Sequence, residues 1–443
     1  MERAFALFMN RMRLTNPSSI SISLALLATL AGCAASDETG PMPGEVRSSL
    51  QRNTAPVVAD ADKTAVVADN ATFASQFYQQ LAAKSAAENL VFSPHSISTA
   101  LAMAFAGADG TTATEMASAL RFGLGQEKVH TAFNWLDLQI SSRGKGASGK
   151  DGQPFRLKVN NALFGQQSLA FEKPFLDTLA LNYDAGVQTV DFAKDAEGAR
   201  SRINNWTADK TENKIKDLMP PGSVSGATRL VLVNTIYMNA GWQKKFETDA
   251  TRSDSFAAPG GTQNVPTMHG TIPAKYADVA GNIAVELPFE GGEVAMTLVL
   301  PKADLATFDA QVQGGQLKTI TDALAQHEVT VSLPKFKLEP DTISVKSELD
   351  ALGMKKAFSG DAEFAKITKA EKLFISDVRH KAFIDVEEGG VEAAAATAVS
   401  FDRTSAVPDP AKVVNFNRPF FFGIRDVKSG AWLFLGHVVK PQG

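Results

Sequence analysis

Apolar residues recur at helical spacing in the first half of the chain. Phe73, Phe77 and Leu81 lie four residues apart, which predicts an amphipathic helix over 71–84. Ser93-Pro94 opens a second helix with an apolar body over 97–105, because serine caps a helix and proline suits its first position. Further helices are predicted over 111–121, 174–182, 195–210 and 345–352.

The second half of the chain carries short apolar or alternating runs, the pattern of β-strands. The predicted class is therefore α+β, with helices first and strands later. We find no internal repeat and no linker after about residue 70, so one folded domain is expected over 67–443. Residues 141–153 are rich in Gly, Lys and Ser and are predicted to form an exposed loop. Strands are predicted over 157–164, 229–238, 284–288, 295–300, 328–333, 372–386, 420–426 and 432–439.

Composition narrows the possible functions. The 443 residues are 44% hydrophobic with a net charge of −4, which supports a large core and gives no basic surface for nucleic acid. Only one cysteine is present, so the chain has no intramolecular disulfide. Six histidines are scattered and do not suggest a metal site, and no cofactor is expected.

The N-terminus reads as an export signal. A basic start precedes an apolar run over 20–31 that is too short for a mature spanning helix. The run ends in Leu-Ala-Gly-Cys at 30–33, which resembles the lipobox of bacterial lipoproteins, in which the cysteine is diacylated. This resemblance predicts a signal peptide over 1–32 and a lipid anchor at Cys33; the alternative is a plain secretory signal.

Residues 33–66 are rich in Ala, Ser, Asp, Pro and Thr without periodicity, so a flexible tether is expected there. Together with the anchor, this tether predicts a protein held at the bacterial cell envelope, in the periplasm or at the cell surface.

Familiar catalytic motifs are missing from the sequence. It contains no Gly-x-Ser-x-Gly elbow and no Walker loop, and His327-Glu328 lacks the second histidine of a zinc-protease motif. An enzyme is therefore not expected.

The segment 387–399, Glu-Glu-Gly-Gly-Val-Glu-Ala-Ala-Ala-Ala-Thr-Ala-Val, is unusual. By propensity alone its alanines favour a helix. Its two glycines, the β-prone residues after it and the nearby prolines weaken that interpretation. A strand that slides between two existing strands would need glycine at a hinge and small side chains.

Six motifs in order give the chain from about 70 to 443 a resemblance to the serpin family. The resemblance implies three β-sheets, about nine helices and an exposed reactive-centre loop. The motifs are LVFSPHSI at 90–97, TENKIKDL at 211–218, VNTIYMNAGW at 233–242, LGM at 352–354, FNRPF at 416–420 and FLGHV at 434–438.

This resemblance implies a suicide inhibitor of serine proteases, whose cleaved loop inserts into the central sheet. Alternate residues of a strand face the core. The expected inward set is small and uncharged, so insertion would bury no unpaired charge. That set is Val391, Ala393, Ala395 and Thr397, and the remaining hinge residues are Glu388, Gly389, Gly390 and Glu392.

The reactive bond has two candidate positions. Counting the usual loop length from Glu388 places it at Thr404-Ser405, and a loop one residue shorter places it at Arg403-Thr404. The second would suit a trypsin-like pocket; an elastase-like or subtilisin-like target also remains open.

By resemblance, Ser93, Asn234 and His380 belong to the shutter beneath the central sheet, and Trp242 belongs to the breach where the loop first enters. A monomer is expected. Two other functions stay open: a non-inhibitory serpin that proteases merely cleave, and an inhibitor of cysteine proteases.

Overall fold

The computed structural model describes residues 44–391 and 410–442, and these residues form nine α-helices and two hydrogen-bonded sheets. The α+β class is confirmed. The helices are α1 (Asp60–Lys84), α2 (Pro94–Phe105), α3 (Gly110–Leu120), α4 (Gly125–Ser141), α5 (Lys173–Tyr183), α6 (Ala196–Lys210), α7 (Leu305–Gln311), α8 (Leu317–Ala323) and α9 (Lys346–Ala351).

The first sheet has the order β1-β4-β3-β5-β15-β14-β11, and β13 pairs with β5 and β12 beside this path. Its centre is β5, which is buried along its whole length. The strands are β1 (Glu45–Val46), β4 (Val187–Val190), β3 (Arg156–Gln166), β5 (Leu230–Gly241), β15 (Gly390–Val391), β14 (Ile384–Glu387), β13 (Asp377–Ala382), β12 (Ile343–Ser344) and β11 (Phe336–Leu338).

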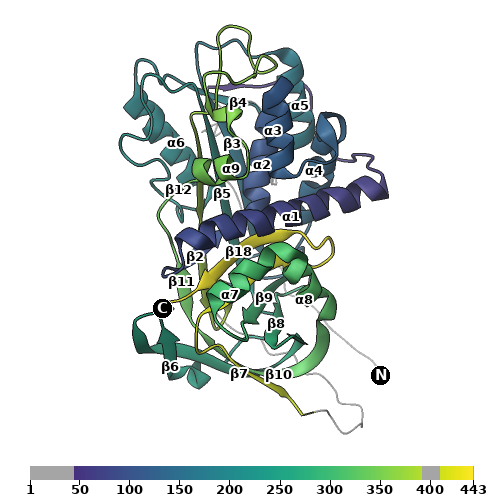
Figure 1. The fold of residues 1–443 in the computed structure, drawn as a ribbon, viewed down its shortest axis with the longest axis vertical. Coiled ribbons are helices and arrows are strands. Elements are labelled where there is room, and N and C mark those ends of the chain that lie inside the picture. Colours follow the sequence, from purple (N-terminus) through teal and green to yellow (C-terminus); the bar gives the residue numbers. More distant parts are fainter. Residues whose placement is uncertain (1–43, 392–409, 443) are drawn as a thin grey trace, which may run out of the picture. The chain divides into compact units, whose positions relative to one another are not determined.

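Alternation along β5 explains why helices cover both faces of this sheet. Val231 and Val233 pack in a cluster with residues of α6, whereas Leu230 and Leu232 pack with residues of α2 and α5. Successive side chains of a strand point to opposite faces. Figure 1 shows α6 on one side of the long strands and α2 to α5 on the other.

The second sheet has the order β16-β10-β7-β8-β9-β17-β18-β2, and β6 pairs with β7. The long β7 is shared by a β16-β10-β7-β6 part and a β7-β8-β9-β17-β18-β2 part. The strands are β16 (Lys412–Asn415), β10 (Ala325–Pro334), β7 (Gly261–Val279), β6 (Arg252–Ala258), β8 (Asn282–Pro288), β9 (Val294–Leu300), β17 (Phe420–Asp426), β18 (Trp432–Val438) and β2 (Leu90–Phe92).

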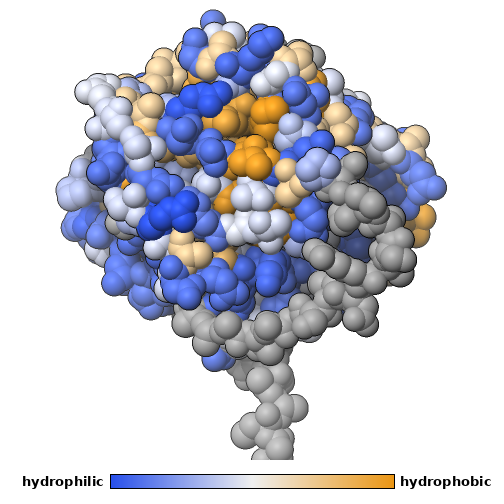
Figure 2. Space-filling model, turned by 90° about the horizontal axis from the view of Figure 1, so that it is seen from below, coloured by the Kyte–Doolittle hydropathy of each residue, from blue (hydrophilic) through white to orange (hydrophobic). Residues whose placement is uncertain are grey.

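Figure 2 shows the end of the molecule that carries β6, β7 and β10. Hydrophilic residues dominate this face, and a small group of hydrophobic residues lies among them. On β16, the strand that follows residues 392–409, the side chain of Val413 is 69% exposed.

The N-terminal prediction needs correction for the described part of the supposed tether, 44–66. β1 pairs with β4, Ser48 donates to Asp177 at 2.6 Å, and Arg52 forms an ion pair with Asp137 at 2.6 Å. α1 also begins within this stretch. Polar contacts with α4 and α5 hold this segment, and such contacts leave no apolar periodicity in the sequence. The packed body therefore begins well before residue 67.

Several elements escaped the sequence prediction, among them α4, β6 and β7. Each carries many polar residues among its apolar ones, and their burial depends on neighbours distant in the sequence. Within residues 44–391 and 410–442, no helix is long and apolar enough to cross a membrane, and no cluster of His, Cys, Asp and Glu could hold a metal ion.

Candidate strand-insertion site

The first sheet is already split at one end by two residues. β15 lies between β5 and β14: Gly390 pairs with Gly241 and Glu387, and Val391 pairs with Ala240 and Val386. Further along β5, β13 pairs directly with it over six residue pairs, from Asp377↔Val231 to Ala382↔Ile236. The sheet therefore has a strand-wide opening at one end and is closed below it.

Gly390 is required by this geometry. Its φ is +142°, and a Cβ at this position would lie 2.2 Å from the carbonyl oxygen of Ala240. Only glycine tolerates both the dihedral and the approach. Val391 follows with 1% of its surface exposed and packs in the core with Trp242 and Val386.

Backbone contacts hold the turn that leads into β15. The Trp242 indole donates to the Glu387 carbonyl at 2.9 Å, and the Trp242 amide donates to the Gly389 carbonyl at 3.0 Å. The Phe246 amide donates to the Glu388 carbonyl at 3.0 Å. Trp242 therefore lies at the entrance to the opening, beside the hinge.

The Glu388 side chain is fixed from two sides. Lys335 donates to one carboxylate oxygen at 2.8 Å, and Thr251 donates to the other at 2.7 Å. Burial raises the pKa of Glu388, but these hydrogen bonds outweigh it and the pKa lies below its ordinary value. Glu388 is thus a charged, anchored residue at the start of the hinge.

Three shutter candidates meet beneath the closed part of the sheet. His380 on β13 is the register partner of Asn234 on β5, and its Nδ1 lies against the Asn234 side-chain oxygen. The Ser93 backbone amide donates to His380 Nε2 at 3.0 Å, and the Asn234 side-chain amide donates to the Arg379 carbonyl at 3.2 Å. The side chains of Asn234 on β5 and His380 on β13 are therefore linked to the backbone at the start of α2.

The hydrogen bonds define the state of His380. Because Nε2 accepts from a backbone amide, Nδ1 carries the proton and donates to Asn234. Burial lowers the pKa of His380 to about 3, so the ring is neutral at physiological pH. The three residues, each fully buried, form a neutral network.

One contributor to the site was missed by sequence reasoning, which predicted an exposed loop over 141–153. Lys150 has no exposed surface, and its ammonium lies 2.9 Å from Glu387 and 3.4 Å from Asp385 on β14. Its amide also donates to the Asn239 side chain on β5 at 2.8 Å. A single lysine in a Gly-rich stretch gives no signal of such burial.

The other predicted site residues lie outside the described residues. This applies to the rest of the hinge, the reactive bond and the lipidation site: Glu392, Ala393, Ala395, Thr397, Arg403, Thr404, Ser405 and Cys33.

Comparison with known proteins identifies the class. The profile of the serpin (serine protease inhibitor) family matches residues 68–441. An uncharacterized serpin-like protein of Thermococcus kodakarensis is 34% identical over 402 residues, which cover 90% of this chain and 91% of that protein. Leukocyte elastase inhibitor of Bos taurus is 37% identical over 385 residues, covering 84% and 99%.

Solved structures agree with this assignment. Human thyroxine-binding globulin, complexed with thyroxine, superimposes with a TM-score of 0.76 at 26% identity, covering 86% of this chain and all of that chain. The chain belongs to the serpin family and has the serpin fold. The proteins that it resembles include an elastase inhibitor and a thyroxine-binding globulin, so the fold does not by itself define the activity.

Proposed function

We propose that this serpin inhibits serine proteases by covalent trapping, through insertion of its cleaved loop into the first sheet. The observation that carries the proposal is the pair Gly390-Val391, already seated between β5 and β14. An opening one strand wide at the end of a closed sheet is a starting point for a longer strand. Residues 393–398, which follow in the sequence, are Ala and Thr only.

The chemistry of trapping is ordinary acyl transfer that stops halfway. The protease serine oxygen attacks the carbonyl carbon of the reactive bond, and the amine of the next residue leaves with a proton. An ester then joins the protease to the loop residue on the N-terminal side of the cut. Water would complete the reaction unless insertion first displaces the protease from its working geometry.

Insertion and hydrolysis therefore compete, and the structure shows what insertion must break. A strand that continues β15 along β5 has to separate the six residue pairs between β5 and β13 and the contact between His380 and Asn234. The new strand supplies replacement hydrogen bonds on both sides, so the opened sheet regains its backbone partners.

The test is incubation of the chain with trypsin, chymotrypsin and elastase, followed by denaturing gels and mass spectrometry of the released C-terminal peptide. We expect a denaturant-stable complex near the summed masses, and a peptide mass that places the cut at Arg403-Thr404 or Thr404-Ser405. Clean cleavage without any complex would contradict trapping and favour a substrate-type serpin. A complex only with a cysteine protease would redirect the specificity.

We also propose that Cys33 carries a lipid anchor, on the evidence of the apolar run and the Leu-Ala-Gly-Cys sequence. In bacteria that express the full chain, Cys33→Ala should move the protein from the membrane fraction to the soluble fraction. Retention of the variant in the membrane fraction would contradict the anchor.

A further inference from the structure

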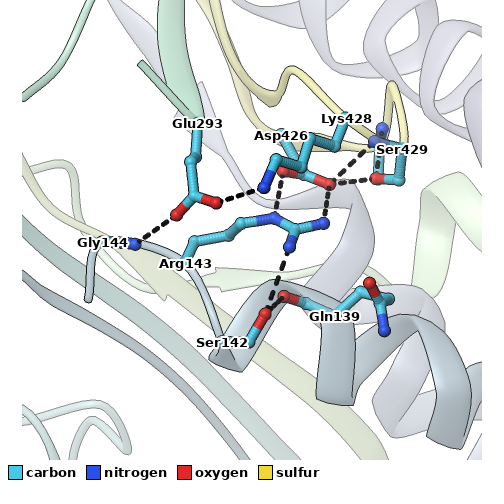
Figure 3. A network of polar contacts seen from close by, with 9 residues as sticks. Gln139, Ser142, Arg143, Gly144, Glu293, Asp426, Lys428 and Ser429 are labelled. Carbon is cyan, nitrogen blue, oxygen red and sulfur yellow. Dashed lines mark hydrogen bonds and ion pairs between the residues drawn. The ribbon is translucent and has the colours of Figure 1, made fainter. Parts of the chain in front are cut away.

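The loop between α4 and β3 is held in place at its first turn by a buried ion pair. Arg143, whose side chain is 6% exposed, donates to both oxygens of Asp426, whose side chain is fully buried, at 2.7 and 3.2 Å. The Gly144 amide donates to Glu293 at 3.0 Å, and Lys428 pairs with the same carboxylate. Figure 3 shows these contacts tying the loop to the β17–β18 turn and to Glu293.

The far end of the loop reaches the split in the central sheet. The Gly241 amide donates to the Ser148 carbonyl at 3.0 Å, and the Lys150 amide donates to Asn239. Both contacts fall on β5. The loop backbone also closes on itself, since the Gly149 amide donates to the Gln153 carbonyl at 2.6 Å. The Lys150 side chain therefore starts from a fixed position.

The Lys150 side chain runs from this loop, which is bonded to β5, to β14. Its ammonium contacts the carboxylates of Asp385 and Glu387 and donates to the Asp385 carbonyl at 3.3 Å. The strand between β5 and β14 at this point is β15, because Gly390 pairs with Gly241 on one side and Glu387 on the other. Lys150 thus connects the two strands while they stand one strand apart.

The charges explain why a cation is needed here. Asp385 and Glu387 are two residues apart on one strand, so their side chains point to the same face and repel each other. Their side chains are 29% and 24% exposed, so water screens them only in part. Lys150 lies near both, whereas Lys335 reaches Glu387 only at 3.7 Å and is engaged by Glu388.

We propose that Lys150 is a positioning residue for loop insertion: it fixes β5 and β14 at the spacing that admits a strand between them, and so favours insertion over hydrolysis. The inference rests on the proposed trapping function. A lysine that instead clamped a closed sheet would contact strands paired directly with each other, as β5 and β13 are, and it would oppose insertion.

The test compares Lys150→Met, Lys150→Arg and the control Lys173→Met by the moles of inhibitor consumed per mole of trapped protease. Lys173 suits the control because its side chain is 79% exposed on α5 and, among the described residues, pairs only with Asp177. We expect Lys150→Met to raise this ratio about tenfold, which corresponds to about 1.4 kcal/mol in the competition between insertion and hydrolysis. Lys150→Arg should restore most of the trapping.

A second variant separates positioning from loss of folding. Lys150→Met with Glu387→Gln removes the cation together with one of the carboxylates it neutralises, so its ratio should return toward that of the unmodified chain. The rate of acylation should stay unchanged in all variants, because the reactive bond is untouched. A Lys150→Met ratio equal to, or below, that of the unmodified chain would overturn the inference while leaving trapping intact. Absence of any complex with the unmodified chain would instead overturn the proposed function.

Discussion

Two regions of the first sheet differ in their side-chain chemistry: the entrance, where β15 separates β5 from β14, and the closed part, where β5 pairs with β13. At the entrance, β15 separates β5 from β14, and the surrounding side chains are charged: Lys150, Asp385 and Glu387. Below it, β5 pairs directly with β13, and the linked side chains are neutral, with Asn234 and His380 fully buried.

This difference explains how one sheet can be stable and still be able to admit a further strand. The two carboxylates at the entrance keep partial access to water, and the buried Lys150 ammonium is paired with both of them, so these groups hold an opening without the full cost of an unpaired buried charge. Neutral hydrogen bonds hold the closed part, and each contributes only about 1 kcal/mol to stability. Insertion can exchange those bonds for new ones along the incoming strand without stranding a charge.

The largest effect is expected from a charged side chain introduced at the buried position 391, inside the entrance. Val391→Arg would bury a guanidinium without a partner, which costs several kcal/mol. We expect the variant to be cleaved as a substrate, with trapping reduced about 100-fold or more on densitometry of denaturing gels. Val57→Arg, at a position 95% exposed, should trap normally. Unchanged trapping by Val391→Arg would show that an uncharged side chain at this position is not required for insertion.

The second-largest effect is expected when the ion pair between Arg143 and Asp426, which holds the loop between α4 and β3, is removed. Arg143→Ala leaves the buried carboxylate of Asp426 without its cation, a change that typically costs about 3–5 kcal/mol. We expect a large fall in the urea concentration at which the intact protein unfolds. Tryptophan fluorescence measures this unfolding. Arg143→Met combined with Asp426→Leu should be much milder, and equal losses in both variants would contradict the ion-pair explanation.

The closed part should respond more weakly. Asn234→Ala leaves the Nδ1 proton of His380 without an acceptor, at a cost of about 1–3 kcal/mol. We expect the intact protein to lose inhibitory capacity on warm incubation roughly 5- to 150-fold faster, because the β5–β13 contact opens more readily. Asn182→Ala on α5, whose side chain donates to the Thr178 carbonyl of the same helix, is the control. Equal rates for the two variants would mean that the network does not hold the sheet closed.

The smallest effect concerns pH. The pKa of His380 is about 3 in the folded protein and about 6.5 when unfolded, so the neutral ring stabilises the fold fully above pH 6.5. This contribution is lost as pH falls from 6.5 toward 3. The loss in the free energy of unfolding amounts to about 2 kcal/mol at pH 5.

Unfolding by urea at pH 7.5 and pH 5 checks this expectation. His130 and His437 are also buried with pKa values of about 4 and shift stability in the same direction. The difference between the unmodified chain and His380→Gln therefore isolates the shutter. An equal pH response in both proteins would contradict a neutral His380.

The sequence was sufficient for many of the elements and insufficient for the contacts between them. Periodicity predicted β17 with correct bounds and most of the helices, because their apolar faces are visible locally. Family resemblance, not spacing, brought Asn234 and His380 together. Lys150 was placed in an exposed loop because its burial depends on Asp385 and Glu387, more than 200 residues away. The polar segment before α1 was taken for a tether for the same reason.

The most direct test of strand insertion is the thermal unfolding of the protein before and after its reactive loop is cut by a protease that it does not trap. If residues 391 onward complete the strand between β5 and β13, the cut protein should unfold at a much higher temperature, and amides of 231–236 should exchange more slowly with deuterium. An unchanged or lower unfolding temperature, with unchanged exchange in 231–236, would contradict insertion as the basis of this protein's function.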